Sequence, residues 1–285
     1  MSVQSATRSI PSHRYTVRTV EGVLGFSRRS SEQAYSYACD PPPGVARTNI
    51  VPDERRVRIE DARLVADDLS LDVEGFALVR SPTAVRDFWD EAQTLGLGHP
   101  EAAELVKAAT GASRVVVFDH TLRRRVEGAD DRGPDAPRQP VTRAHVDQTV
   151  RSGPQRVRDL MGEAAEALLE KRCAIINVWR PIGRPARDWP LALGDARSFA
   201  PDDLIASELR FPHRIGETYG VAYNPAQRWF YVPDLRPDEA LLIKCWDSDP
   251  NVARFAPHTG FEDSTTPPDT PPRESIEFRT LAFFG

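Results

Sequence analysis

The sequence has few of the residues that build disulfides and metal sites, so each of them can be assessed in turn. Its 285 residues include six histidines and three cysteines, Cys39, Cys173 and Cys245. Three widely spaced cysteines form neither a disulfide framework nor a zinc pattern. Cys173 and Cys245 lie in apolar runs, where a small buried side chain is the simplest interpretation. We therefore expect reduced thiols and a cytoplasmic protein.

Long apolar runs and an excess of positive charge are also missing. The longest apolar stretches, residues 115–118 and 241–243, have the length of a strand rather than of a membrane span, and the N-terminal segment lacks the apolar core of a secretory signal. The formal net charge is -5, and the run Arg123-Arg124-Arg125 is interpreted as solvated surface. Glycine-rich nucleotide-binding motifs are absent from the sequence. We therefore expect a small-molecule partner and neither nucleic acid nor a membrane, and a homodimer is compatible with these features.

Proline punctuates the chain. Its 25 prolines cluster at residues 41–43, 134–140 and 267–272, where regular structure is interrupted. Between the first two clusters, residues 69–79 are predicted to form a hairpin around Glu74-Gly75. Residues 83–110 are predicted to form two helices separated by Gly96 and Gly98, and residues 114–118 a β-branched strand.

The second half is richer in strands. A strand is predicted at residues 141–150 and an amphipathic helix at 155–171, followed by short strands at 173–179, 220–223, 229–232, 240–246 and 273–284. Strands separated by turns in this way favour an antiparallel barrel or jelly roll over a βαβ fold. The predicted fold is therefore mainly β with flanking helices. A single domain is expected over residues 1–285, with an extended N-terminal region (1–80) packing on a jelly-roll core (141–285).

Four of the six histidines are given structural or surface roles. They are His13, His99 and His213, expected to be exposed or capping, and His120, expected to be structural.

His145 and Asp147 are two residues apart on an extended run and therefore project from one face. His258 follows the strand-rich segment and can supply a second imidazole. Two histidines and one carboxylate leave three metal positions open, as in iron(II) oxygenases. A zinc hydrolase can use the same ligands, so the trio alone leaves the metal open.

The last predicted strand carries a polar face. Arg273, Ser275, Glu277 and Arg279 alternate with apolar residues and so share one side of the strand. Arg273 and Ser275 together suit a carboxylate. Arg279 is an alternative carboxylate binder, or a salt-bridge partner of Glu277. A half-exposed edge strand with salt-bridging charges would show the same pattern.

An ordered set of motifs resembles one enzyme family. The segments are HVDQT (145–149), NVWRPI (177–182), DWPLALGDARS (188–198), QRWFYVPDLRPDEALLIKCWDS (227–248), APHTGFED (256–263) and PPRESIEFR (271–279). They resemble the iron(II)/2-oxoglutarate-dependent oxygenases that include cephamycin-type hydroxylase components, the novofumigatonin endoperoxidase and gibberellin desaturase-like proteins. The resemblance implies a double-stranded β-helix core, the cofactors Fe(II), 2-oxoglutarate and O2, and oxidation of a small specialised metabolite by hydroxylation, desaturation or a related reaction.

The resemblance also implies roles for individual residues. His145, Asp147 and His258 become the metal ligands, and Arg273 becomes the anchor for 2-oxoglutarate, with Ser275 beside it and Arg279 as the alternative. Further pocket candidates are Asn177, Trp179, Tyr231 and Lys244, for which core packing, or for the lysine a stem reaching to solvent, is the competing interpretation. Two other functions stay open: a metal-dependent oxidase or isomerase of the same fold that does not use 2-oxoglutarate, and a non-catalytic partner subunit.

Overall fold

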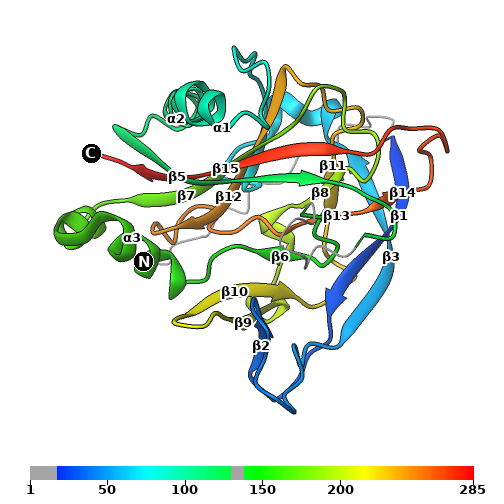
Figure 1. The fold of residues 1–285 in the computed structure, drawn as a ribbon, viewed down its shortest axis with the longest axis horizontal. Helices are drawn as coiled ribbons and strands as arrows, with labels where there is room; N and C mark the ends of the chain where they lie inside the picture. The colour runs from blue at the N-terminus through cyan, green and yellow to red at the C-terminus, as the bar shows by residue number, and fades with distance from the viewer. Residues whose placement is uncertain (1–17, 130–137) are drawn as a thin grey trace, which may run out of the picture.

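Two β-sheets organise the chain in the computed structural model, which describes residues 18–129 and 138–285 (Figure 1). The ten-stranded sheet has the order β14 (Glu262–Asp263), β1 (Thr19–Ser27), β3 (Pro52–Asp61), β11 (Trp229–Tyr231), β8 (Leu191–Gly194), β13 (His258–Gly260), β6 (His145–Val146), β10 (Ile215–Val221), β9 (Leu204–Arg210) and β2 (Ala34–Tyr37). The five-stranded sheet has the order β4 (Phe76–Arg80), β12 (Glu239–Asp247), β7 (Cys173–Pro181), β15 (Glu274–Phe283) and β5 (Arg114–Arg124). The prediction of a mainly β protein with flanking helices is confirmed.

Short helices join and cover the sheets. They are η1 (Ala62–Asp68), α1 (Glu91–Gln93), η2 (Thr94–Gly98), α2 (His99–Thr110), α3 (Ser152–Met161), η3 (Gly162–Ala164), α4 (Ala165–Leu169), η4 (Ala196–Ser198) and η5 (Pro201–Asp203). In Figure 1, α2 lies on the side of the five-stranded sheet away from β9 and β10. Strands β6 and β13 lie between the five-stranded sheet and the pair formed by β9 and β10. No helix of the described segments is both long and apolar enough to cross a membrane.

The central strands of the five-stranded sheet are buried on both faces. Every residue of β7 and of β12 is buried, as expected for a sheet that is covered on both sides. On one face, Val178 and Phe278 pack against Val106 of α2. On the other face, Trp179 packs with Leu193 of the ten-stranded sheet. The space between the two sheets is therefore the main core. Polar side chains buried there are unfavourable unless they have hydrogen-bond or ion-pair partners.

Helices α3 and α4 cover a further part of this core. Val157 and Ala165 pack with Cys173, Ile175 and Cys245. Cys173 and Cys245 are buried free cysteines, as predicted. The apolar side chains of α3 and α4 therefore shield this part of the core from solvent.

The predicted pair of helices in residues 83–110 is wrong in its boundaries. One helical stretch runs from α1 through the π-helical η2 to the end of α2, and it does not stop at Gly96 or Gly98. The ring of Phe278 packs against Gly98 and leaves little room for a larger side chain at this position. The residue that ends the helix is Gly111, whose φ of 72° is left-handed and whose N–H donates to the carbonyl of Lys107.

Two other predicted elements also differ. Residues 69–79 do not form a hairpin: the N–H groups of Glu74 and Gly75 donate to the carbonyl of Ser70 in a turn, and β4 pairs with β12 instead. The helix predicted at 155–171 is interrupted at Gly162, which has a φ of 54°. The strand predicted at 141–150 is regular only over β6.

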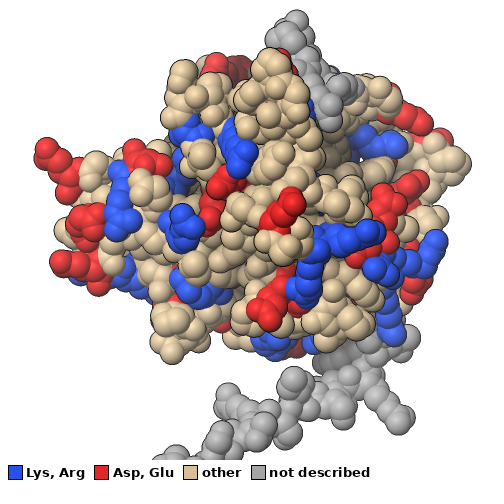
Figure 2. Space-filling view, turned by 90° about the horizontal axis from the view of Figure 1, so that it is seen from below, with Lys and Arg blue, Asp and Glu red and all other residues tan. Residues whose placement is uncertain are grey.

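The N-terminal strands belong to the same sheet as the later ones. β1 and β3 form a long antiparallel pair, and Gly25 of β1 bridges to Arg143, just before β6. The first 17 residues of the predicted N-terminal region (1–80), which include His13, lie outside the described residues, as does most of the proline cluster at 134–140. The described surface carries both signs of charge, and Figure 2 shows acidic and basic side chains interspersed over the face it displays.

Candidate metal centre

Adjacent strands bring the three predicted metal ligands together. His258 on β13 lies directly opposite His145 on β6, and Asp147 follows β6 on the same face as His145. One nitrogen of each imidazole and one carboxylate oxygen lie within 4.8 Å of one another. The two imidazole ring centres are 4.5 Å apart. Two neutral nitrogen donors and one anionic oxygen donor therefore face a common point, which suits a divalent transition metal.

Main-chain carbonyls fix the orientation of both imidazoles. His145 Nδ1 lies 2.9 Å from the carbonyl oxygen of Arg143, and His258 Nδ1 lies 3.1 Å from that of Ala256. Because a carbonyl only accepts, each Nδ1 carries the proton and each Nε2 presents a lone pair. Burial, followed by the nearby His145, lowers the pKa of His258 and so favours its neutral form.

Asp147 is held by donors on one of its two oxygens. Asn177 Nδ2 donates to Asp147 Oδ2 at 2.8 Å, and Arg279 Nε lies 3.3 Å from the same oxygen. Asp147 Oδ1 faces His145 Nε2 at 3.5 Å. Burial opposes ionisation of Asp147, but its interactions with His145, Arg279 and His258 outweigh burial and hold the pKa of Asp147 well below its usual range. Oδ1 is thus the oxygen left for a metal.

Arg279 is saturated by carboxylates of the protein itself. Besides Asp147, its guanidinium pairs with Glu277 at 2.6 Å and with Asp119 at 3.0 Å, and it donates to Thr121 at 2.8 Å. Burial alone would lower its pKa, but these acidic neighbours raise it above its usual value. Each of the three guanidinium nitrogens therefore already has a partner within the protein, which disfavours Arg279 as the binder of an incoming carboxylate.

The guanidinium of Arg273 is buried and forms no ion pair within the described part of the chain, although the main-chain N–H of Arg273 donates to Asp188 Oδ2 at 2.9 Å. Its Nη1 donates to the carbonyl of Trp189, its guanidinium lies over the Trp179 ring at 5.3 Å, and its Nε has no hydrogen-bond partner. The buried hydroxyl of Ser275 also lacks a partner. Burial is the main reason that the pKa of Arg273 falls to about 9. An uncompensated cation beside an unpaired hydroxyl suits an anionic ligand, so these residues fit the distal carboxylate of 2-oxoglutarate.

Two of the pocket candidates are placed away from the triad. The Lys244 side chain is 1% exposed and pairs with Asp72 at 2.9 Å and Asp247 at 2.5 Å, so it neither reaches solvent nor faces the metal centre. Tyr231 packs edge-on against Phe261 in the core on the other side of the ten-stranded sheet, at 5.6 Å between ring centres. Burial raises its pKa to about 12.

The other three histidines of the described residues do not join the site. His99 and His120 are hydrogen-bonded to each other at 3.0 Å and pack on Phe278, so a structural role for His120 fits, whereas His99 is not simply exposed. His213 lies exposed in the turn between β9 and β10.

The residue that sequence reasoning missed is Arg123. The sequence predicts solvated surface for the run Arg123-Arg124-Arg125, but Arg123 is half-buried on β5, directly opposite Ser275 of β15. Strand alternation was the signal that could have revealed it, because Arg123 and Arg124 must face opposite sides.

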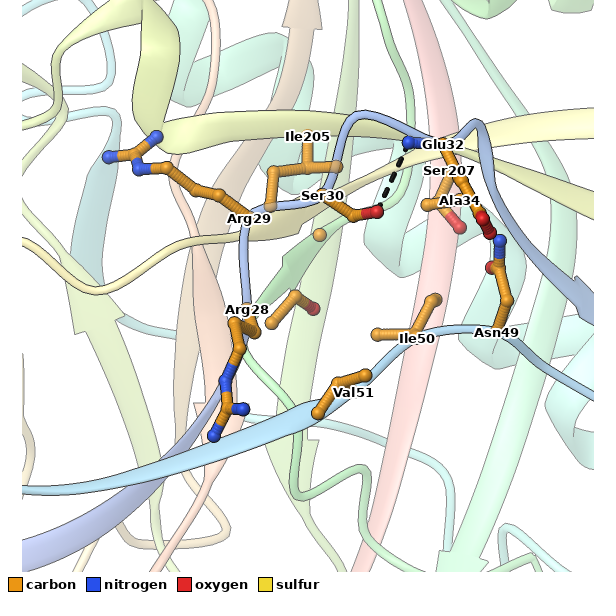
Figure 3. A pocket seen from close by; sticks show the side chains of 12 residues that line it. Arg28, Arg29, Ser30, Glu32, Ala34, Asn49, Ile50, Val51, Ile205 and Ser207 are labelled. Carbon is orange, nitrogen blue, oxygen red and sulfur yellow. Dashed lines mark hydrogen bonds between the residues drawn. The ribbon is translucent and has the colours of Figure 1, made fainter.

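Two cavities lie near the strands that carry the triad. One, of about 150 Å³, has Arg28 and Arg29 at one side and Asn49 at the other (Figure 3). It is smaller than the roughly 300–1,000 Å³ of ordinary small-molecule sites. The other, of about 660 Å³, falls within that range. Its lining includes Pro257, which immediately precedes His258, together with Tyr219 and other apolar side chains.

Comparison with known proteins gives consistent matches over nearly the whole chain. Residues 24–283 match the family described as oxidoreductase/YMDC permease-like domain. The Fe(II)/2-oxoglutarate-dependent dioxygenase nvfI of Aspergillus novofumigatus is 34% identical over 263 residues, covering 90% of this chain and 92% of the relative. The hydroxylase/desaturase efuI of Hormonema carpetanum is 34% identical over 287 residues, covering 93% and 95%.

The fold matches a solved structure as well. The iron and alpha-ketoglutarate-dependent endoperoxidase NvfI aligns with a TM-score of 0.85 at 31% sequence identity, covering 94% of this chain and 98% of that one. The predicted fold class and the predicted family are therefore confirmed.

Proposed function

Since this chain belongs to the family of Fe(II)/2-oxoglutarate-dependent dioxygenases, we propose that it oxidises a small specialised metabolite at the site formed by His145, Asp147 and His258. The protein is an oxidoreductase whose cofactors are Fe(II), 2-oxoglutarate and O2. The observation that carries the proposal for the site is the convergence of the three donor atoms within 4.8 Å, together with a buried Arg273 next to Gly260 of β13 whose guanidinium forms no ion pair among the described residues.

Each residue of the site has one proposed task. His145 and His258 hold Fe(II) through Nε2, and Asp147 holds it through Oδ1 while Asn177 and Arg279 hold Oδ2. When bound, Fe(II) supplies the redox chemistry by which O2 oxidises 2-oxoglutarate to succinate and CO2 and oxidises the substrate.

Arg273 and Ser275 are proposed to hold the distal carboxylate of 2-oxoglutarate. The guanidinium can form a charge-assisted pair with it, and the Ser275 hydroxyl can add a further donor. Trp179 lies under the guanidinium and excludes water from it, which strengthens the pair. Arg279 is proposed as a support for Asp147 rather than as the anchor, because each of its three guanidinium nitrogens already has an acidic partner.

The substrate is proposed to be a small and largely apolar molecule. The relatives named hydroxylase/desaturase make hydroxylation or desaturation the expected outcome. The cavity of about 660 Å³ beside Pro257 has a suitable volume and is lined by Tyr219, Phe199 and Phe255. We further propose a single domain over residues 1–285 and, from its free cysteines, a cytoplasmic protein. A homodimer is the proposed assembly to check by light scattering.

The test is spectroscopic and chemical. Anaerobic addition of Fe(II) and 2-oxoglutarate to the purified protein should produce a visible charge-transfer band, and aerobic turnover with candidate metabolites should release succinate. Asp147→Ala and His145→Ala should lose both signals, while His213→Ala, a change of an exposed histidine, should keep them.

The rival functions predict other results. Iron binding without a band on adding 2-oxoglutarate would favour a metal-dependent oxidase or isomerase that does not use this cosubstrate. A folded protein that cannot be loaded with iron would favour a non-catalytic partner subunit. Full activity of either triad variant would refute the ligand assignment.

A further inference from the structure

Arg123 shares the face of the five-stranded sheet that carries the proposed 2-oxoglutarate anchor. In the register of β5 and β15, Arg123 lies opposite Ser275, and Thr121 lies opposite Glu277. Directly opposed residues of an antiparallel pair point to the same side, with Cβ atoms roughly 4.5–5.5 Å apart. Arg123 therefore points to the side of Ser275 and of Arg273, which precedes Ser275 by two residues.

Arg123 has no carboxylate partner of its own. Its Nη1 donates to the carbonyl oxygen of Gln139 at 2.8 Å, and no acidic side chain of residues 18–129 or 138–285 forms an ion pair with it. Among carboxylates, Glu277 has the largest effect of charge on the pKa of Arg123, but the Glu277 carboxylate is bound to Arg279 at 2.6 Å. The two arginines that follow Arg123 each form an ion pair: Arg124 pairs with Glu274 at 2.9 Å and Arg125 with Asp188 at 3.3 Å.

The result is two poorly solvated guanidinium groups close to each other. Burial and then the charge of Arg123 lower the pKa of Arg273, and burial is also the main cause of the lowered pKa of Arg123. Two like charges in such a place repel each other and lose hydration, which is unfavourable unless an anion lies between them. Arg273 Nε and Ser275 Oγ, which are buried and have no hydrogen-bond partner among the described residues, would also be satisfied by an anion that accepts from them.

We propose that Arg123 is a second guanidinium for the distal carboxylate of 2-oxoglutarate, which it binds together with Arg273 and Ser275. This inference rests on the proposed function and deepens it. One carboxylate has two oxygens and about four acceptor positions, so it can accept from both arginines and the hydroxyl at once. Bound in this way, the ligand neutralises the repulsion between Arg123 and Arg273, and removal of either charge weakens its binding.

The experiment compares two keto acids on two matched variants. Arg123→Met and Arg124→Met are titrated anaerobically, with Fe(II) bound, against 2-oxoglutarate and against 2-oxopentanoate, which has a methyl group in place of the distal carboxylate. The charge-transfer band reports binding without turnover. Arg123→Met should raise the Kd for 2-oxoglutarate by about tenfold or more, since charge-assisted pairs are strong, and leave that for 2-oxopentanoate unchanged. Arg124→Met, which removes an exposed ion pair, should change neither.

The ratio of the two dissociation constants decides the outcome. An unchanged ratio in Arg123→Met overturns the inference, as does an equal loss for both keto acids. Arg123→Lys keeps the charge but not the planar fork and should give an intermediate ratio, and it serves as the deciding variant if the methionine variant does not fold. If the wild-type protein gave no band with 2-oxoglutarate and none with 2-oxopentanoate, the proposed function itself would be refuted.

Discussion

Replacing Arg279 with methionine should weaken metal binding at the triad and leave recognition of the distal carboxylate of 2-oxoglutarate intact. Arg279 Nε holds Asp147 Oδ2 at 3.3 Å, and after the change only Asn177 would hold that oxygen, at 2.8 Å. A carboxylate held by one donor can rotate, so Oδ1 is less well fixed toward His145 and His258. Loss of a partner that orients a metal ligand typically costs about 10- to 100-fold in metal affinity.

The same change should also reduce stability, for a separate reason. Glu277 is 9% exposed and is bound to Arg279 at 2.6 Å, so Arg279→Met leaves a buried carboxylate without its cation. Breaking one side of a buried ion pair costs about 3–5 kcal/mol. Adding Glu277→Gln removes the unpaired charge and should restore most of the lost stability without restoring the position of Asp147.

The assay therefore needs both readouts on both variants. Titration with Co(II), an oxygen-stable substitute for Fe(II), gives the metal Kd, and urea unfolding gives the free energy of unfolding. We expect Arg279→Met to lose affinity and stability, and the double variant to regain stability only. If Arg279→Met kept its metal affinity and instead lost its preference for 2-oxoglutarate over 2-oxopentanoate, Arg279 would be the anchor and the reasoning would be refuted.

Two further predictions concern stability. Gly153→Ala should destabilise the protein by about 1–3 kcal/mol, because the added methyl group would overlap the buried Trp246 ring, whereas Gly96→Ala, with open space around it, should be nearly neutral; urea unfolding of both compares them. Burial opposes ionisation of Glu239, but hydrogen bonds from Arg63 at 2.8 Å outweigh it and lower its pKa below the usual 4.5. The stabilisation is thus present above pH 4.5 and is lost as the pH falls through the lowered pKa, so unfolding measured across this range should show a weaker acid dependence in Glu239→Gln; equal slopes would contradict it.

The placement of His145 and Asp147 on one face could be predicted from sequence because it depends on short-range geometry. The spacing of His145 and Asp147 places both on one face of any extended run, whatever lies around it. The position of His258 opposite His145 depends instead on β13 lying beside β6 in the sheet. That neighbour relation is a property of the topology, and only the family resemblance supplied it in advance.

The pocket candidates show where local pattern fails. Lys244 in an apolar strand can reach solvent or face a ligand, but its partner Asp72 is 172 positions away in the sequence and binds it within the protein. Tyr231 lies on a short strand whose two faces are both buried, so periodicity could not say which face meets the site. In each case the deciding neighbour comes from a distant part of the chain.

The choice between Arg273 and Arg279 follows from the same principle. Arg279 lies on β15 and Arg273 immediately precedes this strand, and the sequence pattern makes either one a reasonable carboxylate binder. They differ only in what the neighbouring strands place beside them: β5 puts Asp119 opposite Arg279, whereas Ser275, beside Arg273, faces the cation Arg123. An arginine surrounded by the protein's own acids is committed to structure, and one facing another cation is left in need of an anion. The charge that lacks an internal partner is therefore the better guide to where the cosubstrate binds than the presence of an arginine in a motif.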